Sequence, residues 1–177
     1  ASKAIVDGIS SVKSLHSLPN HLSFNIYKQI RNKFPWNETL LRLLDSIDLS
    51  VDCIFITSNC LSNPKYLSKS YSFYQKHSEF TIRKIVLTNE KFISFPKTPK
   101  VLCKFTEFPI EQVEFQKIEF DQVTITDFLL CFIGRKVDFV FDKCSGLEEL
   151  PSGVFKDCHI QLLNCMWKDL NAFKDST

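Results

Sequence analysis

The sequence contains little glycine. Only four glycines, Gly8, Gly134, Gly146 and Gly153, occur among its 177 residues. A loop that cradles nucleotide phosphates needs several glycines close together, because its backbone must approach the ligand and adopt positive φ angles. The four glycines are too widely separated for such a loop, so the sequence excludes a glycine-rich nucleotide site.

The sequence also lacks the spacings that mark common metal and nucleophile sites. It has no C-x-x-C pair, no H-E-x-x-H and no G-x-S-x-G. His159 lies between Cys158 and Cys165, but buried core thiols explain these cysteines better than zinc does, and we expect no metal and no cofactor. An enzyme with a dispersed site stays open, because catalytic partners meet in space rather than along the chain. Its groups would be a Cys/His pair or the carboxylates of Glu114, Glu119, Asp121, Asp138 and Asp142.

The sequence also has no large excess of positive or negative charge and no long apolar run. The chain has 22 Lys and Arg against 20 Asp and Glu, which gives no strong electrostatic attraction to nucleic acid or to an anionic membrane. The longest apolar run spans residues 128–133, far short of the roughly 20 residues that a membrane span needs. We expect no membrane partner. Nucleic-acid binding is kept only as an alternative, suggested by abundant aromatic residues and a pI of 8.2.

Cysteine is present in an odd number, seven, and lies mostly in apolar stretches such as DCIFI and LLCFI. This pattern indicates buried thiols in a reducing compartment, whereas a secreted protein with three disulfides and one thiol is the alternative. The chain opens at Ala1 without a basic and apolar leader. We therefore expect a cytoplasmic or nuclear protein.

Apolar residues recur every three or four positions from Leu15 to Leu44, which predicts two helices separated by Pro35. A third helix is expected over residues 64–77, with one apolar face. From residue 51 the pattern changes to short alternating segments typical of strands. We therefore expect one compact domain in which an N-terminal helical segment, residues 1–50, is followed by a strand and helix array, residues 51–177.

Five strand segments share one pattern: apolar, any, apolar, any, any, then Asn, Cys or an apolar residue. They begin at Ile54, Ile85, Val113, Val137 and Ile160, so that successive segments are 31, 28, 24 and 23 residues apart. Repeats of about 20 to 29 residues with a strand of the form L-x-L-x-x-N/C are typical of leucine-rich repeats. Glu90 and Asp142 depart from the Asn or Cys position.

The stretch LEELPSGVF (147–155), followed by IQLLNC (160–165), resembles one leucine-rich repeat running into the strand of the next. The resemblance implies an α/β fold in which a short, irregular leucine-rich-repeat-like array forms a parallel sheet. In such an array alternate strand residues enter a shared core, and the Asn or Cys ties neighbouring turns together.

A second resemblance involves the N-terminal stretch LPNHLSFNIYKQI (18–30), which is similar to the opening helix of an F-box, a module that docks on a ubiquitin-ligase adaptor. The segment LNCMWKDLNAF (163–173) resembles nematode F-box-associated domains, in which a strand ending in Asn-Cys precedes a helix. The first resemblance implies that the adaptor-docking residues are Leu18, Pro19, Leu22 and Ile26.

In this repeat register, the residues between the core positions form one face of the sheet. We expect the protein-binding residues on this face to be Phe55, Thr57, Glu114, Gln116, Asp138, Val140, Gln161 and Leu163, with Val86 and Thr88 beside them. Phe139 is expected to point into the core, whereas Phe55 and Phe141 are expected to point outward. A face that mixes apolar and polar groups suits a protein or peptide better than a polyanion.

These features favour a non-catalytic protein-interaction or adaptor module with a protein partner. Substrate recognition linked to a ubiquitin ligase is the narrower hypothesis. A nucleic-acid-binding domain and an enzyme with a dispersed site are the two alternatives. The sequence leaves the identity of the partner and the oligomeric state open.

Overall fold

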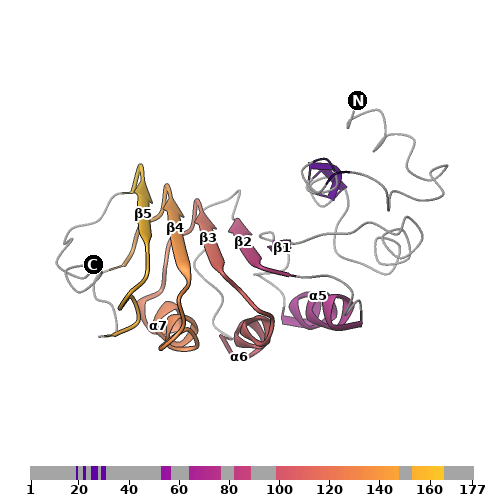
Figure 1. The fold of residues 1–177 in the computed structure, drawn as a ribbon, viewed down its shortest axis with the longest axis horizontal. Coiled ribbons are helices and arrows are strands. Elements are labelled where there is room, and N and C mark those ends of the chain that lie inside the picture. Colours follow the sequence, from indigo (N-terminus) through magenta and orange to yellow (C-terminus); the bar gives the residue numbers. More distant parts are fainter. Residues whose placement is uncertain are drawn as a thin grey trace.

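The computed structural model describes residues 19, 22, 25–27, 29–30, 53–56, 64–76, 82–88, 99–147 and 153–165 (Figure 1). Five strands alternate with helices along this part of the chain. The strands are β1 (Cys53–Ile56), β2 (Lys84–Thr88), β3 (Gln112–Gln116), β4 (Asp138–Asp142) and β5 (Ile160–Leu163). The helices are α5 (Pro64–Lys76), α6 (Pro99–Cys103), the 3₁₀ helix η2 (Lys104–Glu107) and α7 (Gln122–Leu130).

The strands form one parallel sheet in which each strand lies beside the next along the chain, in the order β1-β2-β3-β4-β5. The expected α/β architecture with a parallel sheet is therefore confirmed. Parallel neighbours need a crossover connection, and crossovers of one hand in a sheet of this order lie on the same side. Figure 1 shows α5, α6 and α7 in a row along one side of the strands.

Buried and more exposed residues alternate along β3, and this alternation shows which face of the strand points to the helices. In β3, Val113 and Phe115 are fully buried, whereas Gln112, Glu114 and Gln116 are half-buried. Successive strand residues point to opposite faces, so the apolar set faces the helices. The predicted helix over residues 64–77 is confirmed as α5, whose Leu67 and Tyr74 are buried.

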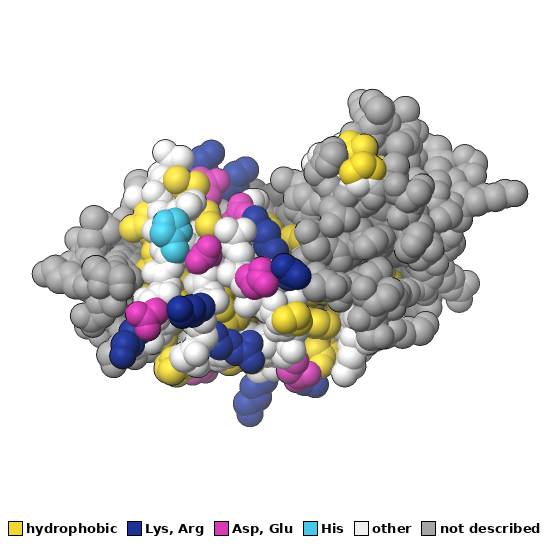
Figure 2. Space-filling model, in the orientation of Figure 1, with side chains coloured by type: hydrophobic (Ala, Val, Ile, Leu, Met, Phe, Trp, Pro, Cys, Tyr) yellow, Lys and Arg dark blue, Asp and Glu magenta, His cyan; other side chains and the backbone are white. Residues whose placement is uncertain are grey.

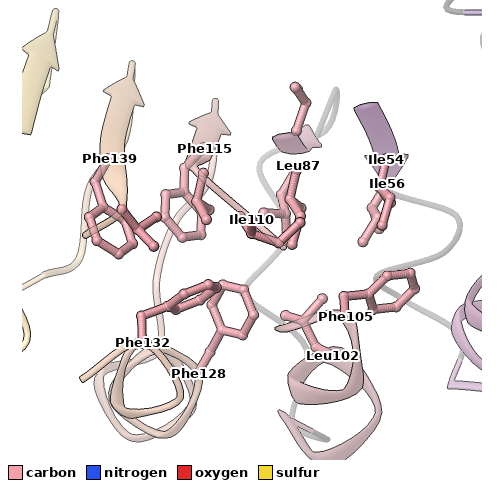
Figure 3. Packing of buried hydrophobic residues seen from close by; sticks show 14 of the residues in the cluster. Ile54, Ile56, Leu87, Leu102, Phe105, Ile110, Phe115, Phe128, Phe132 and Phe139 are labelled. Atoms are coloured by element: carbon pink, nitrogen blue, oxygen red, sulfur yellow. The ribbon is translucent and has the colours of Figure 1, made fainter. Parts of the chain in front are cut away.

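Phenylalanine rings fill the space between the sheet and the helices (Figure 3). The rings of Phe115 in β3 and Phe141 in β4 are stacked, with centroids 4.9 Å apart. From α7, Phe128 meets Phe115 edge to face, and Phe132 in the following turn meets Phe139 in the same way. Offset-stacked and edge-to-face pairs each contribute about 0.5 to 1.5 kcal/mol beyond the burial of their area.

The register of β4 differs from the expected one by two residues. Phe139, not Val137, lies opposite Val113, and the same row continues to Ile160. Phe141 therefore points into the core and is fully buried, so its expected outward position is wrong. Val137, Phe139 and Phe141 are all apolar and alternate along the chain, so the sequence pattern allows the segment to start at Val137 or at Phe139. The structure has the second register, which buries the rings of both Phe139 and Phe141.

The corrected frame reveals a repeated set of backbone and thiol contacts. Cys144 and Cys165 each occupy the sixth position of their segment, and their thiols donate to the carbonyl oxygens of Phe115 and Phe141, respectively. Each acceptor is the third residue of the preceding segment. Weak hydrogen bonds of this kind connect β3 to β4 and β4 to β5 at equivalent points.

The residue before each sixth position turns the chain out of the strand. Lys117, Lys143 and Asn164 have φ angles of 53°, 55° and 54°, in the left-handed region. The amides of Lys117 and Lys143 donate to Asp142 and Leu163 of the next strand, each at 2.8 Å. The left-handed turn is therefore a repeated feature of β3, β4 and β5.

At the N-terminal side, Leu22 and residues 25–27 and 29–30 are helical. The remainder of the first predicted helix, the helix after Pro35 and residues 166–173 lie outside the described residues. No helix in the described ranges is long and apolar enough to cross a membrane.

Gly146 provides a test of how closely the turns beyond β3 and β4 approach each other. Gly146 and Gly153 have the same φ of 81°, but a Cβ at Gly146 would lie 2.5 Å from the carbonyl oxygen of Phe120, whereas Gly153 faces open space. Both Gly→Ala variants carry the left-handed strain of about 1 to 2 kcal/mol. We expect Gly146→Ala to lower the free energy of unfolding by more than Gly153→Ala, measured by urea denaturation. Equal losses would contradict this packing.

Candidate functional site

The candidate site is the face of the sheet that points away from α5, α6 and α7, here named the open sheet face. One row of residues crosses all five strands on this face, and a second crosses β2 to β5. The register gives the first row as Phe55, Val86, Glu114, Val140 and Gln161, and the second as Thr88, Gln116, Asp142 and Leu163. Helices α5, α6 and α7 lie on the opposite side of the sheet, and the helical residues of the N-terminal segment, drawn in indigo, lie apart from this row (Figure 1).

The accessible part of the open sheet face lies over β3, β4 and β5. Asp138, Gln161 and Leu163 are exposed, and Glu114 and Gln116 are half-buried. Towards β2 the face closes, because Val86 and Thr88 are 2% and 8% exposed. The side chain of Phe55 and all of Thr57 lie outside the described residues.

Val140 is a correction to the expected contact set. It lies on the open sheet face as predicted, but only 8% of it is exposed. In its row the longer side chains of Glu114 and Gln161 stand on either side, and a short valine between them offers little surface. Val140 thus forms the floor of the face and is a poor direct contact for a partner.

The carboxylate of Glu114 is held by two neighbours on this face. Lys84 Nζ of β2 lies 2.7 Å from Glu114 Oε2, and Gln116 Nε2 donates to Glu114 Oε1. The side chain of Glu114 is only 19% exposed. A half-buried pair of this geometry is screened less by solvent than a surface pair, so it fixes the orientation of both side chains.

Asp138 and Asp142 are two further carboxylates of this face. Both lie on the open sheet face, and within the described ranges no ion pair involves either carboxylate. Because Lys84 already pairs with Glu114, the face is net negative, although the whole chain has a formal net charge of +2. Lys117 and Lys143 follow strands β3 and β4 at the left-handed turns, beyond the strand rows.

Asp142 was absent from the expected contact set because the sequence pattern placed it at the Asn/Cys position. The corrected register assigns it to the same row as Gln116 and Leu163. The signal that could have found it is Cys144, two residues later, which fits the Asn/Cys position once the segment starts at Phe139.

The expected adaptor-docking residues are only partly accessible. Pro19 and Leu22 are exposed, but Ile26 is 1% exposed and belongs to the buried core cluster. Leu18 lies outside the described residues. A docking surface here would therefore use Pro19 and Leu22 without Ile26.

The residues considered for catalysis or zinc do not converge in the described ranges, where no three His, Cys, Asp or Glu side chains come together. His159 is exposed, while the thiol of Cys158 is buried and donates to the carbonyl oxygen of Val154 at 3.7 Å. Cys165 donates its thiol towards Phe141 instead. The two cysteines and His159 thus have separate surroundings.

Comparison of the chain with models of known protein families, with curated proteins and with solved structures finds no match in any of the three.

The buried thiol of Cys144, in the core beneath this face, should make the stability of the fold depend on pH. Burial raises the pKa of its thiol to about 12 from 9.0, since the thiolate loses hydration in the core. Below pH 9 the thiol is protonated in both the folded and the unfolded chain, so its full contribution to stability is present. As the pH rises from 9 towards 12, the thiol ionises in the unfolded chain first, and this contribution is lost. We expect the stability difference between the wild type and Cys144→Ala to narrow, by on the order of a few kcal/mol in total, over this range.

Urea denaturation at pH 7 and pH 11 measures this change. Val113→Ala is the matched control, because it truncates a buried side chain of the same core that does not titrate. The difference in unfolding free energy between Val113→Ala and the wild type should be the same at both pH values. If the difference for Cys144→Ala is also the same at both, the raised pKa of the Cys144 thiol is wrong.

Proposed function

We propose that this chain is a non-catalytic protein-interaction module, built as a short leucine-rich-repeat-like array, that binds a protein partner on the open sheet face over β3 to β5. The observation that carries the proposal is the one-sided covering of the sheet. Helices α5, α6 and α7 lie along one face, while Asp138, Gln161 and Leu163 are exposed on the other.

The corrected register supports the repeat-like part of the proposal. Residues 139–144 read FVFDKC and residues 160–165 read IQLLNC, so both fit the form L-x-L-x-x-C with Ile or Phe in place of some Leu. The thiols at their sixth positions donate to the preceding turn, which is the tie that such repeats require.

The chemistry of the face favours a partner segment that carries Lys or Arg. Asp138 and Asp142 lie four residues apart on β4 and therefore on the same face, with the floor residue Val140 between them. A basic side chain over either carboxylate gains an ion pair, and Leu163 offers an exposed apolar contact at 46% exposure. The fixed pair of Lys84 and Glu114 completes the polar part of the surface.

Nucleic-acid binding is the weaker reading of the same surface. A phosphate backbone needs a stripe of Lys and Arg, whereas the open sheet face is net negative. Figure 2 shows basic and acidic side chains interspersed over the described residues of the face that it presents. Within the described ranges, no cluster of three His, Cys, Asp or Glu side chains supports the enzyme alternative.

The ubiquitin-ligase link is a narrower proposal, supported by the F-box resemblance and by the exposure of Pro19 and Leu22. The burial of Ile26 counts against a docking surface that uses the whole expected set.

Two exposed leucines on opposite sides of the molecule allow a matched test. Leu163 on the open sheet face is 46% exposed, and Leu130 at the end of α7 is 41% exposed. The full chain is used to capture a partner from cell extract, and the affinity of the purified partner is then measured for each variant. We expect Leu163→Glu to weaken binding at least about tenfold, whereas Leu130→Glu changes it less than about twofold.

Asp138→Asn with Asp142→Asn tests the charge of the partner segment. The paired substitution should weaken binding and should reduce its dependence on salt, because ion pairs are screened. Equal loss for Leu163→Glu and Leu130→Glu, or unchanged binding in both, would place the contact surface elsewhere. A nucleic acid as the captured species would overturn the proposal.

A further inference from the structure

Two cysteine side chains meet on the helical side of the molecule, away from the open sheet face. Cys103 is the last residue of α6, and Cys131 directly follows α7. Both are half-buried and free. They are 28 residues apart in the chain, and the packing of the two helix ends brings them together.

The two thiols share one acceptor. The carbonyl oxygen of Asp127 lies 3.3 Å from Cys131 Sγ and 3.8 Å from Cys103 Sγ. Cys131 is also a neighbour close enough to raise the pKa of Cys103. A disulfide needs two sulfurs that can approach to about 2.05 Å without large backbone movement, and two thiols that share one acceptor lie close enough to do so.

No other two described cysteines share an acceptor. Cys165 lies near enough to Cys144 to raise its pKa, but the two thiols donate to different carbonyl oxygens. Cys53, Cys144 and Cys158 are buried, and Cys165 is half-buried with its thiol directed to Phe141 O. Among the described thiols, only Cys103 and Cys131 share an acceptor and are both accessible to solvent. This combination is what a reversible oxidation site requires.

We propose that Cys103 and Cys131 form an oxidation-sensitive dithiol that a peroxide converts to a disulfide, linking the end of α6 to the end of α7. In the first step the sulfur of Cys131 attacks hydrogen peroxide; the O–O bond breaks, and sulfenic acid and one water form. In the second step the Cys103 sulfur attacks the sulfenic sulfur, an S–S bond replaces the S–O bond, and a second water leaves. The two sulfurs lose two electrons in total, and the peroxide accepts them.

The order of the two steps follows from the surroundings of Cys103. Its burial, followed by the neighbouring Cys131 thiol, raises the pKa of Cys103 to about 12, so it stays protonated at neutral pH. A protonated thiol reacts slowly with peroxide, because the thiolate is the nucleophile. Cys131 is therefore the sulfur that is oxidised first, and Cys103 is the resolving thiol.

The test uses the folded, reduced chain treated with a few equivalents of hydrogen peroxide at pH 7.5. Free thiols are then blocked with N-ethylmaleimide, and the digested protein is examined by mass spectrometry. We expect a linked pair of peptides that contain Cys103 and Cys131, two hydrogens lighter than the reduced pair, and its loss after treatment with dithiothreitol. The linked protein should also melt at a higher temperature than the reduced form, because a cross-link restricts the unfolded chain.

Two variants separate this site from general oxidation of thiols. Cys131→Ser should abolish the linked peptides and the rise in melting temperature, while Cys165→Ser, which alters another half-buried thiol, should leave both unchanged. A variant that fails to fold is recognised by its circular dichroism, and wild-type mapping then decides alone. The proposal is overturned if Cys103 and Cys131 remain free while Cys165 oxidises, or if both reach sulfinic acid without linking.

Discussion

The order of the strands is the constraint on which the rest of the structure depends. The five strands are parallel and follow one another in chain order, so each connection must cross over the sheet and return. Connections of one hand then lie on one face, and α5, α6 and α7 occupy that face. A sheet built in this way has one face buried in the core and a second face that α5, α6 and α7 leave uncovered.

Aromatic packing fixes how the strands align within that arrangement. Phe115 and Phe141 stack across β3 and β4, and Phe128 meets the pair from α7. The thiols of Cys144 and Cys165 add equivalent contacts between β3 and β4 and between β4 and β5. Because the inward residues are fixed by this packing, the outward residues between them are fixed as well, and these form the candidate surface.

Much of the fold could be predicted from the sequence, because most elements carry a clear hydrophobic period. The strands at Ile54, Ile85, Val113 and Ile160 and the helix α5 follow from alternation and from three- and four-residue spacing. The helix α7 was not predicted. Its residues, QVTITDFLL, are rich in β-branched side chains that favour strands, and tertiary packing of Phe128 overrides that preference.

The candidate surface was predictable only in part. Alternation identified Glu114, Gln116, Asp138, Gln161 and Leu163 as outward residues. It could not distinguish two frames for β4, since Val137, Phe139 and Phe141 are apolar at the same parity, and so it misplaced Phe141 and omitted Asp142. The burial of Val140 and Ile26 and the contact between Cys103 and Cys131 depend on long-range packing that no local pattern records.

The alignment of β3 with β4 tests the central claim most directly, and NMR measures it through nuclear Overhauser effects between backbone protons of the two strands. The account predicts contacts that place Glu114 opposite Val140 and Gln116 opposite Asp142. Contacts that place Glu114 opposite Asp138, or an absence of contacts between β3 and β4, would contradict the inward packing of Phe141 and the surface that follows from it.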